Sequence, residues 1–278
     1  MPELPEVETT RRMLAPHLIG RVFTGARLEW PKAVVYPDAD SFEQRLIGRQ
    51  VVALDRRGKH LVLRLDDGSS LIVHLRMTGS LQFAAQAALP ARFTRNTLLL
   101  DGDRELRFVD VRKFGQMWLV GADELERLPY RLTGPEPLDP DFTVSALAEL
   151  LLKRRGKLKA TLLDQHVLAG LGNIYVDEVL FEAALHPERT IDRLTGADIV
   201  RLHAAVVAVL QRGIANQGTS YRDFVGPFGE AGSNQEDLRV WRRAGQPCLR
   251  CGTPIQKLRV AGRGTHVCPR CQPLTTGW

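Results

Sequence analysis

The pattern of apolar and polar positions changes about halfway along the chain. Residues 2–18 carry Val7, Leu14 and Leu18 at helical spacing and predict a helix that begins with a proline. From there to residue 131 the pattern is that of short strands, in which apolar and polar residues alternate between turn sequences. We expect strands at 21–28, 51–55, 61–65, 71–75, 97–100, 105–109 and 115–120. Several short strands without long helices between them favour an antiparallel β-sandwich.

The proline-rich residues 132–142 interrupt this pattern and predict a linker. After it the spacing is helical, and we expect helices at 143–152, 158–165, 173–184 and 195–216, the last capped by Thr195. Residues 217–235 are glycine-rich and polar, which is typical of a mobile lid. The chain is thus expected to be an α+β multidomain protein. Its predicted parts are a β-sandwich with flanking helices (1–131), a helical domain (143–237) and a C-terminal ribbon (238–278).

The net charge of the chain indicates which class of binding partner to expect. The 278 residues have a net charge of +6 and a pI of about 9.4. Residues 238–278 contain eight Lys or Arg and no Asp or Glu, which favours a polyanion such as nucleic acid. No apolar run approaches the ~18 to 20 residues of a membrane span, and the acidic N-terminus does not resemble a signal peptide. We therefore expect a cytoplasmic protein with no membrane partner.

All four cysteines lie in the basic C-terminal segment, as two Cys-x2-Cys pairs separated by sixteen residues. They are Cys248, Cys251, Cys268 and Cys271. This spacing is typical of a four-thiolate site for one Zn²⁺, whose closed coordination leaves no position for a reactive water. The metal is therefore expected to be structural. Two disulfides or separate thiols are the alternative, which a chain without a secretion signal disfavours.

A glycine turn between two predicted helices is the second motif. Gly170 and Gly172 permit a tight turn with exposed backbone N–H groups, and Asn173 begins the next helix with its positive dipole end. Such a turn can hold a phosphate, although an ordinary helix connection has the same sequence features. It lacks the Lys-Ser/Thr of an ATP-binding P-loop. The nearby basic residues, Arg155 and Lys159 among them, favour a nucleic-acid backbone.

The N-terminus carries the third motif. Removal of Met1 would give Pro2 a free secondary amine, and an α-amino group has a reference pKa near 8 against about 10.4 for lysine. Attack of that amine on a sugar C1′ gives an iminium ion that is positive without protonation. Glu3 can exchange protons beside it. The alternative is that a proline and an acid simply start a helix.

Other candidates lie on predicted loops beside strands. Lys59 precedes a strand, and Met77, Arg112 and Phe114 follow strands. A solvated lysine and ordinary loop residues are the simple interpretation. Alternatively, Met77 and Phe114 are apolar wedges and Arg112 a hydrogen-bonding arm, which together fill a duplex after a base is extruded.

Taken together, MPELPEVET at the start, Lys59, Arg112-Lys-Phe114, LAGLGNIYVDE at 168–178 and the four-cysteine ribbon with Arg263 resemble bacterial formamidopyrimidine-DNA glycosylase over the whole chain. The resemblance implies a helix-two-turns-helix in the helical domain, a zinc finger, and a monomer that acts on damaged double-stranded DNA at the nucleoid. It implies a bifunctional glycosylase and AP lyase for oxidised purines, with Pro2 as Schiff-base nucleophile and Glu3 as acid/base. Lys59 would assist β-elimination and Arg263 δ-elimination.

The same resemblance implies the residues that contact DNA. These are His74, Met77, Arg112, Phe114, Arg155, Lys159, Asn173 and Tyr175. The chain departs from the family at Phe93-Thr94-Arg95, where relatives usually have a histidine-rich stretch. The sister family for oxidised pyrimidines usually begins PEGPE and lacks the Arg-x-Phe wedge, so Leu4 and Phe114 favour the purine enzyme. A non-catalytic zinc protein that binds DNA remains the other alternative, but it gives Pro2 and Glu3 no task.

Overall fold

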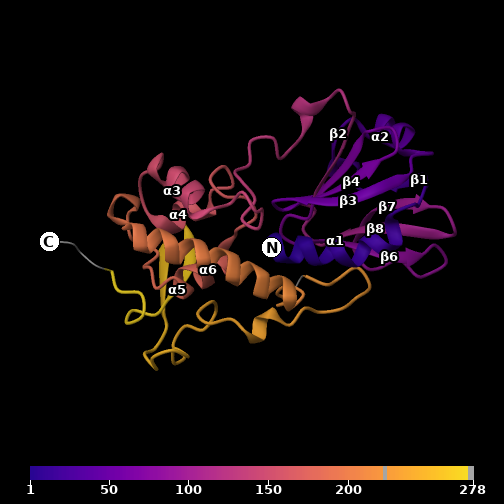
Figure 1. The fold of residues 1–278 in the computed structure, drawn as a ribbon. Helices are drawn as coiled ribbons and strands as arrows, with labels where there is room; N and C mark the ends of the chain where they lie inside the picture. Colours follow the sequence, from indigo (N-terminus) through magenta and orange to yellow (C-terminus); the bar gives the residue numbers. More distant parts are fainter. Residues whose placement is uncertain (222–223, 275–278) are drawn as a thin grey trace. The chain divides into compact units, whose positions relative to one another are not determined.

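The computed structural model describes residues 1–221 and 224–274 (Figure 1). The chain forms two compact units, one of residues 1–132 and 216–235, the other of residues 133–215 and 236–278. Residues 217–235, predicted as a lid within the helical domain, are grouped with the first unit. Residues 222 and 223 of that prediction, and residues 275–278 of the predicted ribbon, lie outside the described residues. Among the described helices, none combines the length and apolar character needed to cross a membrane.

The first unit contains two β-sheets, which confirms the predicted sandwich. The four-stranded sheet has the order β1-β7-β8-β6 and is antiparallel. The five-stranded sheet has the order β2-β9-β5-β4-β3, in which only β2 runs parallel to its neighbour. The strands are β1 (Phe23–Leu28), β2 (Val34–Tyr36), β3 (Val51–Arg57), β4 (His60–Leu65), β5 (Ser70–His74), β6 (Gly79–Ala85), β7 (Thr94–Leu100), β8 (Arg104–Asp110) and β9 (Gln116–Val120).

One hydrophobic core draws on both sheets and on the helices α1 (Leu4–Leu18) and α2 (Ala39–Leu46). Leu61 and Leu63 of β4 point into it, while Val62 between them belongs to a second cluster on the other face of the same sheet. Tyr130 packs on that second cluster. The five-stranded sheet is therefore covered on both faces, which explains why β4 is apolar at successive positions.

The N-terminal helix is fixed by its neighbours in the first unit. It packs against β3 and β4. Loop residues 216–235 also reach it, because Phe228 contacts His17 with ring centroids 4.7 Å apart and lies 6.2 Å from Phe83 of β6. The Phe83 backbone N–H donates to the Pro227 carbonyl at 3.0 Å. The described part of this loop thus has a defined position on α1 and β6.

The second unit is helical with a C-terminal hairpin, as the sequence predicts. Its helices are α3 (Val144–Leu152), α4 (Leu158–Leu163), α5 (Asn173–Glu182) and α6 (Gly196–Ala215), and its strands are β10 (Gln256–Val260) and β11 (Arg263–Val267). Thr195 caps α6 as predicted, because its hydroxyl accepts from the Asp198 backbone N–H at 3.2 Å. Short 3-10 turns complete the two units at Pro31–Ala33, Leu125–Arg127, Ile191–Arg193 and Asn234–Glu236.

Candidate active site and nucleic-acid interface

Pro2 and Glu3 are buried just before α1, with Glu3 as the N-cap of that helix, while Met1 is exposed. A carboxylate oxygen of Glu6 accepts from the Glu3 backbone N–H at 2.8 Å. The other oxygen of Glu6 accepts from the Thr219 backbone N–H at 2.7 Å. Glu6 therefore joins the N-terminal turn to the loop 216–235, and the helix begins at a fixed point rather than fraying.

Lys59 lies in the tight turn between β3 and β4. Gly58 has a φ of +55°, a left-handed conformation that glycine adopts without strain, and Arg57 pairs with His60 across the hairpin. Lys59 itself is buried. Because α1 packs on these two strands, the turn that carries Lys59 and the helix that begins after Pro2 belong to elements in direct contact.

The rings of two histidines pack together beside this turn. The rings of His60 on β4 and His74 on β5 are 4.6 Å apart, edge to face. Burial lowers the pKa of His60 to about 4 and that of His74 to about 2, with the charges of neighbouring arginines acting in the same direction. Both rings are thus neutral at physiological pH. Nδ1 of His74 accepts from the Arg76 backbone N–H at 3.0 Å, so the neutral ring carries its proton on Nε2.

Met77, Arg112 and Phe114 come together on two loops of the first unit. The Arg112 guanidinium donates to Met77 Sδ at 3.2 Å and lies 4.8 Å from the centre of the Phe114 ring. Met77 is 38% and Phe114 49% exposed, so both large apolar side chains meet solvent. Three residues that the sequence separates by up to 37 positions therefore form one protruding cluster, with two apolar tips around a cationic donor.

Asp110, which sequence reasoning missed, organises the base of that cluster. Its carboxylate accepts from the backbone N–H groups of Arg112 at 3.1 Å and Gly115 at 2.7 Å, and from the Thr78 hydroxyl. Asp110 is buried. The carboxylate thereby closes both ends of the 111–115 loop and ties it to the loop after Met77. The only sequence signal was an Asp at the end of a strand.

In the second unit, the glycine turn and the hairpin turn lie together. Gln165 holds the glycine turn through the Gly170 N–H at 3.0 Å and the Leu171 carbonyl at 2.7 Å. Asn173, the first residue of α5, donates from Nδ2 to the Gly264 carbonyl at 3.0 Å, and its Oδ1 is buried without a hydrogen bond. Arg263 is exposed at the start of β11, beside a two-residue turn in which Ala261 and Gly262 both have positive φ. The helix start and the arginine are thus parts of one surface.

Lys159 and Tyr175 differ from the expectation that they contact DNA. The Lys159 side chain has 0% exposure and pairs with Asp177 at 2.6 Å, with a further bond to the Thr265 hydroxyl at 2.8 Å. Tyr175 is also buried, packed so closely on α6 that any side chain at Gly213 would overlap its ring. Lys159 thus supports the hairpin through Thr265, while Tyr175 packs α5 on α6. Arg155 is exposed, as a phosphate contact requires.

Consecutive acids of α5 attach the C-terminal segment. The second oxygen of Asp177 accepts from the His266 backbone N–H at 2.9 Å. Glu178 accepts from three successive N–H groups, Arg239 at 2.8 Å, Val240 at 3.0 Å and Trp241 at 2.8 Å. Burial raises the pKa of Glu178, and the three N–H groups oppose that rise. Sequence reasoning missed both acids, because no sequence pattern identifies the backbone N–H groups that they bind.

The four cysteines form a structural zinc site. Their sulfurs all lie within 4.8 Å of one another, with Cys248 and Cys271 3.9 Å apart and Cys251 and Cys268 3.5 Å apart. A tetrahedron with Zn–S bonds of about 2.3 Å needs sulfurs roughly 3.8 Å apart, so the cluster fits Zn²⁺. Four thiolates fill the coordination sphere. The ion therefore holds the loops that flank the β10–β11 hairpin and takes no part in bond breaking.

Comparison with known proteins decides the family. The chain matches the models of the formamidopyrimidine-DNA glycosylase N-terminal domain over residues 1–117, of its H2TH domain over 133–225, and of the zinc finger found in FPG and IleRS over 245–274. It is 48% identical to the formamidopyrimidine-DNA glycosylase of Chloroflexus aurantiacus over 273 residues, 98% of each chain. The chain belongs to the formamidopyrimidine-DNA glycosylase family.

Other relatives agree along the whole length of the chain. The formamidopyrimidine-DNA glycosylase of Desulforamulus reducens is 46% identical over 275 residues, 98% of this chain and 99% of that protein. The structure matches that of Lactococcus lactis Fpg in complex with DNA containing an abasic site, at 40% identity and a TM-score of 0.90, over 98% of this chain and 99% of that one. MutM in complex with DNA containing carbocyclic 8-oxo-G matches equally well, at 40% identity and a TM-score of 0.90.

Proposed function

We propose that this member of the formamidopyrimidine-DNA glycosylase family is a bifunctional glycosylase and AP lyase of base excision repair that removes oxidised purines from double-stranded DNA. The observation that carries the proposal is a full-length match to formamidopyrimidine-DNA glycosylases together with a Pro2-Glu3 start held in a fixed turn. The bound DNA of similar structures contains an abasic site or carbocyclic 8-oxo-G. An enzyme of chromosomal DNA works in the cytoplasm at the nucleoid, and we propose that location and a monomeric state.

The proposed reaction begins at the Pro2 nitrogen. In the processed chain its lone pair attacks C1′ of the damaged nucleotide, the N-glycosidic bond breaks, and the base leaves with the bonding electrons and a proton. Ring opening gives an iminium ion between the proline nitrogen and C1′. Glu3 exchanges the protons needed at the sugar oxygen and the leaving base.

The iminium ion then makes strand cutting possible. It acidifies the C2′ hydrogen, so loss of that proton expels the 3′ phosphate by β-elimination, and a second elimination expels the 5′ phosphate. Lys59 is proposed to assist the first elimination. Arg263 and Asn173 are proposed to hold the phosphates of the damaged site, where cationic and amide donors stabilise the departing oxyanions.

The remaining proposed contacts keep the duplex open. Met77 and Phe114 provide the apolar tips that replace an extruded base in the stack, and Arg112 supplies the hydrogen-bonding arm. Arg155 is proposed to bind a backbone phosphate and His74 to donate from Nε2–H to another. Lys159 and Tyr175 are proposed to stabilise the DNA-binding surface without contacting DNA themselves.

Borohydride trapping tests the proposal. The processed chain is incubated with a duplex that contains 8-oxoguanine opposite cytosine, reduced, digested and analysed by mass spectrometry. We expect a covalent adduct on the peptide that begins with Pro2. The matched control is the same chain with Met1 retained, in which the proline nitrogen is an amide. Binding of the duplex without any adduct from the processed chain would leave a non-catalytic DNA-binding protein as the function.

A further inference from the structure

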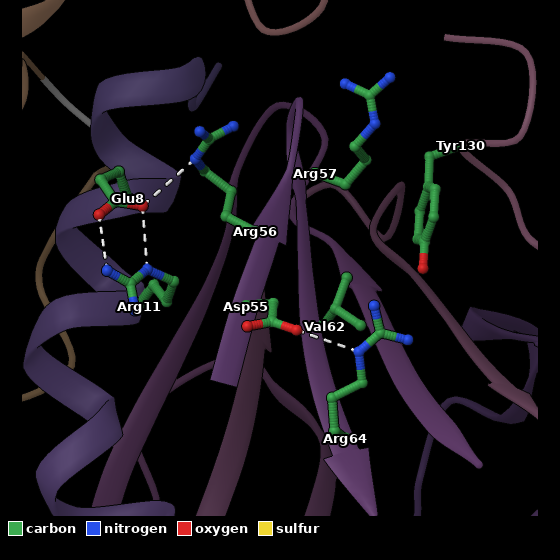
Figure 2. Close-up of a pocket in the computed structure, with 8 residues that line it drawn as sticks. All are labelled: Glu8, Arg11, Asp55, Arg56, Arg57, Val62, Arg64 and Tyr130. Atoms are coloured by element: carbon green, nitrogen blue, oxygen red, sulfur yellow. Dashed lines mark hydrogen bonds and ion pairs between the residues drawn. The ribbon is translucent and has the colours of Figure 1, made fainter. Parts of the chain in front are cut away.

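A buried carboxylate on α1, that of Glu8, binds arginines from two elements, and Figure 2 shows its bonds to Arg11 and Arg56. Glu8 accepts from Arg11 at 2.8 and 3.0 Å and from Arg12 at 2.7 Å, both on the same helix. Its third partner, Arg56 at 3.3 Å, comes from β3, 48 positions along the chain. Glu8 is therefore both a helix-surface ion pair and a link between α1 and the β3–β4 hairpin.

The link to β3 lies largely out of solvent. The side chains of Glu8 and Arg56 are each 10% exposed. Burial alone would raise the pKa of Glu8, but hydrogen bonds from Arg11 and Arg12 and the charge of Arg56 outweigh it and hold the pKa at about 2. The carboxylate is thus ionised at neutral pH. Arg12, by contrast, is 60% exposed and pairs with Glu8 from within the same helix.

Arg56 carries the link on to the turn that holds Lys59. Its Nη1 donates to the Gly58 carbonyl at 3.0 Å, the peptide group that leads directly into Lys59. Arg11 makes a second link, from its Nη1 to the Leu54 carbonyl of β3 at 3.2 Å. The hairpin is thus tied to the helix at two backbone carbonyls, both through arginines that Glu8 orients.

We propose that Glu8 is a positioning residue: through Arg56 it sets where the Lys59 turn stands relative to the helix that begins after Pro2. The inference rests on the proposed function, because it matters only if Pro2 and Lys59 act on the same sugar. Two reacting groups on different elements need a fixed separation, and small misplacements of catalytic groups are costly in rate. An arginine cluster on one buried carboxylate provides that rigidity.

The test is a double-mutant cycle in strand cleavage. Glu8→Gln keeps the size of the side chain but loses its charge, and Lys59→Ala removes the amine that Glu8 is proposed to position. Cleavage of a duplex with a preformed abasic site is followed under single-turnover conditions, with borohydride trapping in parallel. We expect Glu8→Gln to slow cleavage about tenfold or more in the wild-type background and less than twofold in the Lys59→Ala background. Trapping at Pro2 should change much less than cleavage.

Glu105→Gln is the matched control. Glu105 is also a buried carboxylate held by two arginines, Arg27 at 2.7 Å and Arg107, but it lies on β8 in the other sheet. The same chemical change there should leave cleavage within twofold of wild type. Arg56→Met provides a second route to the same answer, because Glu8 keeps both helix arginines and the Arg11 bond to the Leu54 carbonyl, and only the bond to the Gly58 carbonyl beside Lys59 is lost.

The outcomes distinguish a failure of the positioning role of Glu8 from a failure of the proposed function. Equal rate losses for Glu8→Gln in both backgrounds, or equal losses from Glu105→Gln, would overturn the positioning role while leaving the lyase intact. So would full activity of both Glu8→Gln and Arg56→Met. If the wild-type chain gives no trapped adduct, or if Lys59→Ala cleaves as fast as wild type, the proposed function or the role of Lys59 fails first and the positioning role with it.

Discussion

The burial of Lys159 makes a prediction opposite to that of the sequence. If Lys159 supports the hairpin turn from beneath, Lys159→Ala leaves Asp177 charged, buried and without its main partner. Removing one member of a buried ion pair costs about 3 to 5 kcal/mol. For a unit of this size the loss corresponds to a decrease in Tm of roughly 10 to 20 °C. The change should also loosen the turn that carries Arg263, because the Lys159 bond to Thr265 is lost.

Lys157→Ala is the control for this change. Lys157 pairs with Glu188, but the two side chains are 51% and 30% exposed, so the pair should contribute no more than about 1 kcal/mol. Scanning calorimetry of the zinc-loaded full chain measures both variants, and DNA binding at several salt concentrations accompanies it. An unchanged Tm for Lys159→Ala, with a salt slope reduced by about one, would mean that Lys159 contacts a phosphate and that our reasoning is wrong.

Three further predictions follow from the site. Asp110→Ala should weaken binding of lesion-containing duplex about tenfold, because the 111–115 loop loses both of its N–H contacts to the carboxylate. Fluorescence anisotropy measures that affinity, and an unchanged value would refute the prediction. His60 has a folded pKa of about 4 and His74 of about 2, both below the usual 6.5, so the unfolded chain binds protons that the folded chain does not. Stability should therefore fall as pH decreases from 6.5 to 4, with about 3 kcal/mol at most from His60, and His60→Phe should make that fall less steep in urea titrations. Chelation of the zinc should unfold the hairpin region and reduce DNA affinity, and metal-free protein that binds DNA normally would contradict a structural role for the ion.

Much of the fold follows from local patterns. Alternation located the β4–β5 and β7–β8 hairpins, and helical spacing located α1 and α6 to within a few residues. Three elements, β2, β6 and α2, were not predicted. Strand β2 has only three residues and pairs with distant β9, so its partner and not its own sequence defines it.

The candidate site, too, was only partly predictable from the sequence. The cysteines and the loop with Arg112 and Phe114 could be singled out from the sequence, because the residue types themselves suggest a chemistry. Asp110 and Glu178 could not be recognised, since each acts on backbone N–H groups that no sequence pattern marks. Lys159 was interpreted as a surface charge because it stands among exposed basic residues, and only the packed helix shows that its partner is a buried aspartate.

Helix α5 has a consequence for how this family can be engineered. Four of its residues attach it to the C-terminal segment. Asn173 donates to the Gly264 carbonyl of β11, Asp177 accepts from the His266 backbone N–H, Glu178 accepts from backbone N–H groups of 239–241, and Phe181 packs in the apolar cluster that contains Cys248. A chimera that exchanges the metal-binding segment alone would sever all four attachments at once. The smallest transferable module therefore includes α5, and the zinc finger is an extension of that helix more than a separable domain.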